Sequence, residues 1–280
     1  MFHSITTITL TNIGVITLLV FLVTRHNPLK TFIGFFVSLK KERLLLYHLL
    51  AALTVLLLNK IELTIEDAMN VQADFTPFFY QIEGPFIHLI HTYLETPPLT
   101  AVLTFFYIIV FTSLLVASLF IYFHDHDRRS LYTLLYAVML NYLIAIPFFL
   151  FFPVLETWVI HPQVEFLIPQ IYPAFEQEYR AVSGLDNCFP SLHTSMSVTL
   201  AMIAARSKNR LFGKIVPVCA GIILFSIFYL GIHWFLDAAS GTVLALISVH
   251  FASRLANDPI GGSKLPPQPT LYDNQTSDLD

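Results

Sequence analysis

Residues 211–231, LFGKIVPVCAGIILFSIFYLG, form an apolar run that contains a single charged residue, Lys214. A helical run of about 20 residues spans the hydrocarbon core of a bilayer, which is ~30 Å thick. The chain as a whole has the same character, because 55% of its 280 residues are hydrophobic and only 12% are charged. A soluble domain of this size needs more polar surface. The sequence therefore predicts an all-α integral membrane protein.

Other apolar runs of similar length predict a bundle of about six to seven transmembrane helices. The shorter stretch of residues 29–39 is also apolar, and we expect it to lie in the membrane interface or to pack against the bundle. The first run is followed, not preceded, by its basic residue Arg25, which favours an uncleaved helix over a signal peptide. The expected spans are residues 5–23, 44–59, 99–123, 131–153, 191–206, 211–231 and 235–254.

The positions of the basic residues predict an orientation. If the N-terminus is outside, Lys60 and Arg180 are outer residues and every other lysine and arginine is on the inner side. Cytoplasmic loops carry an excess of Lys and Arg. We therefore expect the N-terminus and the functional site outside and the C-terminus in the cytoplasm. A plasma membrane is expected, although an internal membrane with the site facing its lumen fits the same charge pattern.

Composition divides the chain into three regions. Residues 1–95 hold N-terminal helices and an outer amphipathic segment, residues 96–256 hold a helical core, and residues 257–280 form a polar, Pro- and Gly-rich tail that is expected to be disordered. The outer segment, residues 60–98, contains the mixed polar and aromatic stretch of residues 74–80. It is either an amphipathic cap on the membrane or an ordinary surface loop, and the sequence favours neither.

Charge and cysteine content exclude some classes of function. The net charge is −4, and no basic cluster with interleaved aromatics indicates nucleic-acid binding. The two cysteines, Cys188 and Cys219, are too few for a disulfide framework and lack the spacing of a metal site. We expect both to serve as small apolar packing residues.

The first motif that indicates chemistry is Cys188-Phe-Pro-Ser-Leu-His-Thr-Ser195. Pro190 suits the first turn of a helix, where its missing N–H has no partner to lose. The unpaired N–H groups of that turn bind anions, with help from the helix dipole. Ser191 adds a hydroxyl group, and His193 lies one turn in. This arrangement suits a phosphate group with a histidine close to its leaving oxygen.

The second motif is Gly231-Ile-His-Trp-Phe-Leu-Asp237. His233 and Asp237 are four residues apart and share one face of a helix. A carboxylate beside an imidazole fixes its tautomer and leaves the other nitrogen able to attack. Ionisable groups at this membrane position indicate function. Two alternatives stay open: a structural hydrogen bond, or a metal site built from His193, His233 and Asp237, which no further ligand cluster supports.

The two motifs resemble those of a known superfamily. Residues 190–193, Pro-Ser-Leu-His, resemble the second motif of the type-2 phosphatidic-acid phosphatase superfamily of membrane phosphatases and phosphotransferases, which is usually Pro-Ser-Gly-His. Residues 229–237, Tyr-Leu-Gly-Ile-His-Trp-Phe-Leu-Asp, resemble its third motif. The separation of one helical hairpin also fits. The resemblance covers roughly the C-terminal half of the chain.

By that resemblance, each motif residue has an expected role. His233 is the nucleophile that forms a phosphohistidine, and Asp237 orients and stabilises it. His193 protonates the leaving oxygen. Ser191 and the backbone N–H of Leu192 hold the phosphate. The resemblance implies no metal and no other cofactor.

The chain departs from the family pattern at three places. Leu192 replaces the usual Gly, which is similar to the branch containing inositol-phosphorylceramide synthases. Ile227 stands where the third motif normally has Arg. Residues 152–158 occupy the region of the first motif without any cation. Two expected phosphate-binding cations are thus missing, as in the synthase branch.

Bound phosphate still needs a positive charge. Arg180 precedes the first motif by about ten residues, and a planar guanidinium holds two phosphate oxygens at once. We expect Arg180 to bind the phosphate. The alternative is a loop salt bridge between Arg180 and Glu176 or Glu178.

These observations predict a membrane-embedded, metal-independent lipid phosphatase that cleaves a phosphoester or pyrophosphate of a lipid phosphate. One alternative is a lipid phosphotransferase of the inositol-phosphorylceramide-synthase type. Another is a non-catalytic protein that binds or translocates lipid phosphates, and a third is a metal-dependent hydrolase. The expected partners are a lipid phosphate or phospholipid substrate and the membrane, with no nucleic acid. The sequence leaves the oligomeric state open.

Overall fold

The computed structural model describes residues 4–69, 73–179 and 184–257, which are mainly helical. Extended backbone pairs in this part of the chain only at a single parallel bridge between Val154 and Asn187. The prediction of an all-helical fold is confirmed. The helices are α1 (Ile5–Thr24), α2 (Pro28–Lys41), α3 (Arg43–Met69), α4 (Thr76–Leu94), α5 (Pro97–Phe105), the π-helical turn η1 (Phe106–Val110), α6 (Phe111–His124), α7 (Arg128–Phe151), α8 (Thr157–Ile160), α9 (Ile168–Ile171), α10 (Phe175–Tyr179), α11 (Leu192–Arg206), α12 (Phe212–Tyr229) and α13 (Phe235–Leu255).

Six helical stretches in the described residues are long and apolar enough to cross a bilayer. They are α1, most of α3, the continuous run from α5 through η1 to α6, and α7, α12 and α13. The remaining expected span is α11, which has 15 residues and is therefore roughly 22 Å long at 1.5 Å per residue. That length is less than the ~30 Å of a hydrocarbon core. The protein is an integral membrane bundle of six full-length spans and one short helix.

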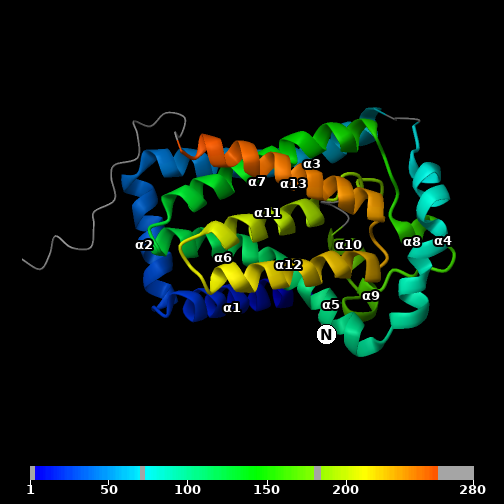
Figure 1. The fold of residues 1–280 in the computed structure, drawn as a ribbon, viewed down its shortest axis with the longest axis horizontal. Coiled ribbons are helices and arrows are strands. Elements are labelled where there is room, and N and C mark those ends of the chain that lie inside the picture. Colours follow the sequence, from blue (N-terminus) through cyan, green and yellow to red (C-terminus); the bar gives the residue numbers. More distant parts are fainter. Residues whose placement is uncertain (1–3, 70–72, 180–183, 258–280) are drawn as a thin grey trace, which may run out of the picture.

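The short helix α11 packs against α7, α12 and α13 inside the bundle (Figure 1). Its packed face carries small and hydroxyl-bearing side chains, which let neighbouring helices approach closely. Asn141 of α7 joins two of them. Ser195 Oγ donates to Asn141 Oδ1, and Asn141 Nδ2 donates to Thr199 Oγ1 at 3.2 Å. These buried hydrogen bonds fix which faces of α7 and α11 meet.

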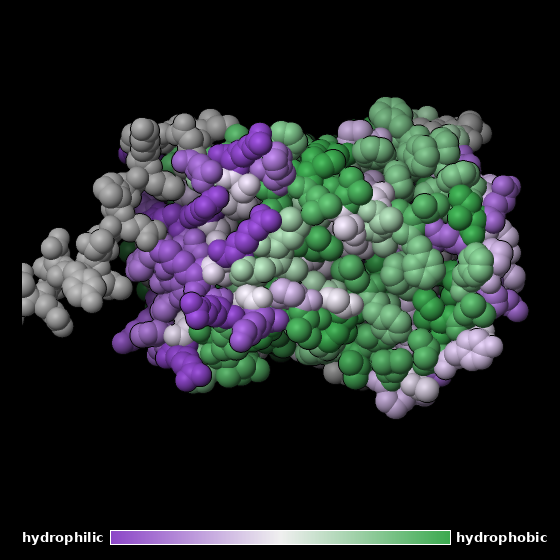
Figure 2. Space-filling model, in the orientation of Figure 1, coloured by the Kyte–Doolittle hydropathy of each residue, from purple (hydrophilic) through white to green (hydrophobic). Residues whose placement is uncertain are grey.

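The outer surface of the bundle is apolar over its middle, while polar side chains gather most densely at one end (Figure 2). Large hydrophobic side chains stay about half exposed on four helices: Leu18 of α1 at 54%, Leu53 of α3 at 48%, Val218 of α12 at 65% and Leu246 of α13 at 49%. An apolar surface of this extent is stable when lipid covers it.

Helix α2 lies across one end of the bundle, which we call the α2 end (Figure 1). Its Phe35 is 3% exposed and packs edge-on against Phe120 and Phe123 of α6, with ring centroids 5.1 and 5.3 Å away. Glu42, directly after α2, accepts two hydrogen bonds from the guanidinium of Arg128 at the start of α7. The expectation that residues 29–39 pack against the bundle is confirmed.

Helix α4 lies across the opposite end, which we call the α4 end (Figure 1). Because α3 continues to Met69 and α4 begins at Thr76, the described residues of the segment 60–98 are mainly helical and not an irregular loop. Phe79 of α4 is 2% exposed and packs near Trp234, with ring centroids 6.4 Å apart. Helix α4 thus contacts the second sequence motif directly.

Helix α13 passes very close to the start of α11 at Gly241. A Cβ atom at this position would lie 2.4 Å from the carbonyl oxygen of Ser191 and 3.1 Å from the Cβ of Thr194. The nearer atom belongs to the backbone, which cannot rotate away. Only glycine therefore allows this spacing between the two helices.

We predict that Gly241→Ala destabilises the protein by about 1–3 kcal/mol, the usual cost of inserting a carbon into a packed interior. The measurement is the thermal unfolding midpoint of the detergent-purified protein. The matched control is Gly221→Ala in α12, where a new Cβ meets nothing within 4 Å. That control should unfold at the same temperature or slightly higher, because alanine favours the helix. Equal midpoints for both variants would show that Gly241 does not set the helix spacing.

Candidate active site

The first motif places Ser191 as the N-cap of α11. Ser191 is fully buried, and its Oγ accepts a hydrogen bond from the backbone N–H of Thr194 at 3.2 Å. The helix begins at Leu192, so Pro190 lies just before the cap and not in the first turn as predicted. A serine side chain caps a helix better than the preceding proline can. The first unpaired N–H groups of α11 are thus those directly after Ser191.

The second motif reverses the chain between α12 and α13. Gly231 has a φ of +79°, and a Cβ on it would lie 2.5 Å from the carbonyl oxygen of Glu165. The N–H groups of Ile232 and His233 both donate to the carbonyl of Ile227, at 3.1 and 3.2 Å. His233 therefore precedes α13 and does not lie on it, while Asp237 occupies its first turn.

His233 and Asp237 nevertheless form the predicted pair. Nδ1 of His233 lies 3.1 Å from Oδ2 of Asp237, and the two residues are 4% and 0% exposed. On the other side of the ring, Nε2 lies 3.4 Å from Ser191 Oγ. Because a carboxylate can only accept, it selects the tautomer with hydrogen on Nδ1. The lone pair of Nε2 then faces the cap of α11.

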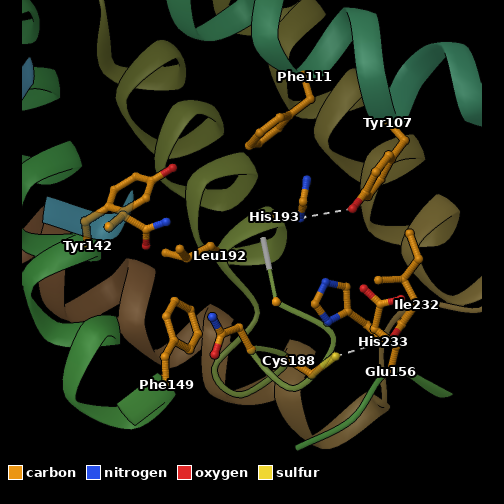
Figure 3. Close-up of a pocket in the computed structure, with 13 residues that line it drawn as sticks. Tyr107, Phe111, Tyr142, Phe149, Glu156, Cys188, Leu192, His193, Ile232 and His233 are labelled. Carbon is orange, nitrogen blue, oxygen red and sulfur yellow. Dashed lines mark hydrogen bonds between the residues drawn. The ribbon is translucent and has the colours of Figure 1, made fainter. Parts of the chain in front are cut away.

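His193 lies in the first turn of α11, opposite His233. The two imidazole centroids are 6.0 Å apart. Tyr107 stacks on the His193 ring at 4.3 Å and places its hydroxyl 3.5 Å from Nδ1, and Phe111 contacts it at 4.9 Å (Figure 3). Two aromatic rings thus hold the His193 side chain in place.

The third span supplies both aromatic rings through a local irregularity. The π-helical turn η1 runs from Phe106 to Val110, between α5 and α6. A π turn holds one more residue than an α turn. Tyr107, within this turn, and Phe111, directly after it, both contact the same imidazole. Sequence reasoning missed both residues, because an aromatic pair in a Phe-rich span carries no distinguishing signal.

A cavity of about 120 Å³ lies beside the two histidines. Its described lining contains no lysine or arginine (Figure 3). It does contain one carboxylate, Glu156, whose Oε2 accepts a hydrogen bond from Trp158 Nε1 at 2.5 Å. The lining residues are Asn59, Tyr107, Phe111, Tyr142, Phe149, Glu156, Gly184, Asn187, Cys188, Leu192, His193, Ile232 and His233.

Comparison with known families shows which superfamily the chain belongs to. The family model described as PAP2 superfamily matches residues 82–251, more than half of the chain. The chain belongs to the PAP2 superfamily. No curated protein and no solved structure matches it. Members of this superfamily generally catalyse phosphoester hydrolysis, so membership supports an enzyme acting on lipid phosphates. The match begins within α4, well before the two motifs.

The segment 152–158 joins the two motif loops of this PAP2 protein. The N–H of Val154 donates to the carbonyl of Asp186 at 2.8 Å, and the N–H of Cys188 donates to Val154 at 3.2 Å. Further along, the N–H groups of Thr157 and Trp158 donate to the carbonyls of Ile232 and Gly231, at 3.2 and 3.0 Å. The segment 152–158, which contains no lysine or arginine, therefore links the loops of the two motifs through backbone hydrogen bonds.

Ile227 stands at the position where the third PAP2 motif normally has arginine. Ile227 is 0% exposed, belongs to an apolar cluster and does not line the cavity. Its contribution to the site is its backbone carbonyl, which receives the N–H of His233. Arg180, the expected phosphate ligand, lies outside the described residues.

A carboxylate that the sequence did not single out supports the second motif. Glu83 of α4 is 5% exposed and accepts hydrogen bonds from the backbone N–H of Phe235 and, at 2.6 Å, of Leu236. Burial raises the pKa of Glu83, and these two hydrogen bonds oppose that shift. Glu83 thus caps α13 across a sequence separation of about 150 residues. Because Glu83 occupies the positive N-terminal end of α13, the first turn of α11 is the helix start that remains available to an anion.

We predict that Glu83→Ala lowers both stability and activity, because the first turn of α13 loses its two acceptors. The loss of a helix cap costs about 0.5–2 kcal/mol. The measurements are the unfolding midpoint in detergent and the rate of phosphate release from a lipid phosphate.

Glu83→Gln is the matched control for this prediction. It keeps one side-chain carbonyl as acceptor and should retain more stability and activity than the alanine variant. If the two variants behave like the unsubstituted protein, Glu83 does not hold α13 in place.

Proposed function

We propose that this protein is a membrane-embedded lipid phosphatase that hydrolyses a phosphoester or pyrophosphate of a lipid phosphate through a phosphohistidine on His233. The observation that carries the proposal is the alignment of three groups. Nδ1 of His233 lies 3.1 Å from Asp237, while Nε2 lies 3.4 Å from the Oγ of Ser191. The nucleophilic nitrogen thus faces the helix start that binds anions.

In the first step, the phosphate group lies at the start of α11. The N–H of Leu192 and the hydroxyl of Ser191 bind its oxygens. Nε2 of His233 attacks phosphorus, and Asp237 stabilises the positive charge that develops on the ring. His193 protonates the departing oxygen. The 6.0 Å between the ring centroids of His193 and His233 supports placing one phosphoryl group between them.

In the second step, His193 removes a proton from water, which attacks the phosphohistidine and releases phosphate. Neither step uses a metal ion or another cofactor. An alternative acceptor, a lipid or polyol hydroxyl, makes the protein a phosphotransferase of the inositol-phosphorylceramide-synthase type. Leu192 in place of glycine and the absence of lysine and arginine from the described cavity lining favour that alternative.

The proposal extends to the placement of the protein. We infer a plasma membrane with the α4 end and the active site outside and the C-terminus in the cytoplasm, because lysine and arginine concentrate in the loops at the α2 end. Residues 96–256 form the catalytic core in this proposal. A non-catalytic role in binding or translocating lipid phosphates is the remaining alternative.

We predict that His233→Ala abolishes turnover, because it removes the nucleophile. The purified protein is given a lipid phosphate together with an inositol phospholipid, and both free phosphate and new lipid species are followed. His88→Ala is the control, since His88 stacks on His161 and does not line the cavity.

Each outcome of this experiment selects one function. Free phosphate that disappears in the variant supports the phosphatase. A new phospholipid with little free phosphate supports the phosphotransferase. Absence of any His233-dependent product overturns both and favours the binding protein.

We predict that Arg180→Ala weakens substrate binding by about tenfold, which corresponds to about 1.4 kcal/mol. The physical reason is the loss of a guanidinium that pairs with two phosphate oxygens. The KM for a lipid phosphate is the measurement. Lys60→Ala is the control, because Lys60 is exposed and also expected on the outer side. Equal KM values for the Arg180 variant and the unsubstituted protein would remove Arg180 from the site.

A further inference from the structure

Cys188 lies beside the His233–Asp237 pair, although it was expected to be only a packing residue. Its backbone N–H donates to Val154 at 3.2 Å, and its Sγ lies 3.5 Å from the carbonyl oxygen of Ile232. These contacts hold the side chain in the cavity wall next to His233 (Figure 3). The residue is therefore part of the site and not only a packing residue.

Three different ligand types meet at this point. One potential ligand atom each from Cys188, His233 and Asp237 lies within 4.8 Å of the other two. All three residues are buried, with exposed fractions of 2%, 4% and 0%. Oδ1 of Asp237 is also buried and has no hydrogen-bond partner of normal geometry among the described residues. A buried acceptor without a donor is costly unless a ligand satisfies it.

The chemistry of the three groups selects one class of ion. A thiolate, an imidazole and a carboxylate are the ligands that Zn²⁺ prefers, whereas Mg²⁺ and Ca²⁺ prefer oxygen ligands alone. Three protein ligands leave a fourth tetrahedral position for water or a phosphate oxygen. Cys188 lies in the loop before α11, His233 lies just before α13 and Asp237 in its first turn, and the segment 152–158 hydrogen-bonds to the backbone beside both Cys188 and His233.

We propose that Cys188, His233 and Asp237 bind Zn²⁺, and that the bound ion inhibits the enzyme. The inhibitory part of this proposal rests on the proposed function of His233 as nucleophile. A ring nitrogen of His233 that binds the ion either loses the lone pair that attacks phosphorus or loses its hydrogen bond to Asp237. Attack stops in both cases. Because substrate and Zn²⁺ both need His233, excess substrate should relieve the inhibition, and a chelator should reverse it.

The first test compares zinc inhibition of phosphate release in three proteins. The unsubstituted protein should be inhibited, and Cys188→Ser should need about tenfold more Zn²⁺ or more for the same inhibition. The chain offers a matched control in its other cysteine. Cys219 lies in α12 and does not line the cavity, so Cys219→Ser should be inhibited like the unsubstituted protein.

The second test needs no turnover. Co²⁺ bound by a thiolate absorbs in the near ultraviolet through sulfur-to-metal charge transfer. The unsubstituted protein and Cys219→Ser should show this band, Zn²⁺ should displace it, and Cys188→Ser should lack it. If Cys188→Ser does not fold, the band and its displacement in the unsubstituted protein still decide whether the site exists.

Three results would overturn the proposal. The first is equal zinc inhibition of the Cys188 and Cys219 variants, and the second is a Co²⁺ spectrum without a cysteine-dependent band. The third is activation by Zn²⁺, which would make the ion part of catalysis. If the protein shows the band but turns over no lipid, the metal site stands and its inhibitory role is rejected. Failure of the proposed function is therefore distinguished from failure of the metal site.

Discussion

The contact between the first turns of α11 and α13 determines the geometry of the site. The N–H of Ser191 donates to the carbonyl of Asp237 at 3.1 Å, and Gly241 one turn later lets the Ser191 carbonyl approach the backbone of α13. Every distance between the two histidines depends on this contact, since His193 follows one helix start and His233 precedes the other. The buried hydrogen bonds of Asn141 fix α11 on its other side, against α7. Two packed faces thus hold the histidines at a constant separation.

Two helix N-termini meet at the site, and they are capped by different groups. Each carries partial positive charge from unpaired N–H groups, which is strong in a surrounding of low dielectric constant. At α13 the side chain of Glu83 accepts hydrogen bonds from the N–H groups of Phe235 and Leu236. At α11 the cap is the uncharged hydroxyl of Ser191. An anionic substrate therefore finds one attractive helix start and one that is already occupied. This asymmetry compensates in part for the absence of cations from the described cavity lining.

The sequence was sufficient to predict the membrane class, the helical fold and the superfamily. Length and hydropathy are local properties, so most spans could be located to within a few residues, and the two motifs lie on either side of one hairpin. The second span is the exception, because α3 continues to Met69 and was expected to end near residue 59. The spacing of His233 and Asp237 predicted a pair, which the structure contains, although His233 precedes the helix. The roles assigned to these residues stay predictions.

Other parts of the site depend on contacts between distant segments. Glu83 of α4 contacts the start of α13 although the two lie about 150 residues apart in sequence, and Tyr107 of the third span stacks on His193 of α11. Neither feature leaves a pattern in the sequence. Cys188 was interpreted as a packing residue because the two cysteines lack the spacing of a metal site, whereas the potential ligands beside it, His233 and Asp237, are distant in the sequence. Pro190 was predicted in the first turn of α11, but the helix begins two residues later, at Leu192, because Ser191 is its cap.

The shortness of α11 has a consequence for how the protein meets its substrate. If Arg206, near the polar α2 end, lies at one membrane surface, the 15 residues of α11 end short of the opposite surface, which places the first turn, with His193, below the headgroups at the α4 end. A lipid can then bring its headgroup to the histidines while its acyl chains remain among their neighbours. The concentration that governs the rate is accordingly the mole fraction of substrate in the membrane. Diluting the bilayer with an inert lipid should slow the reaction even when the amount of substrate per volume of buffer is constant.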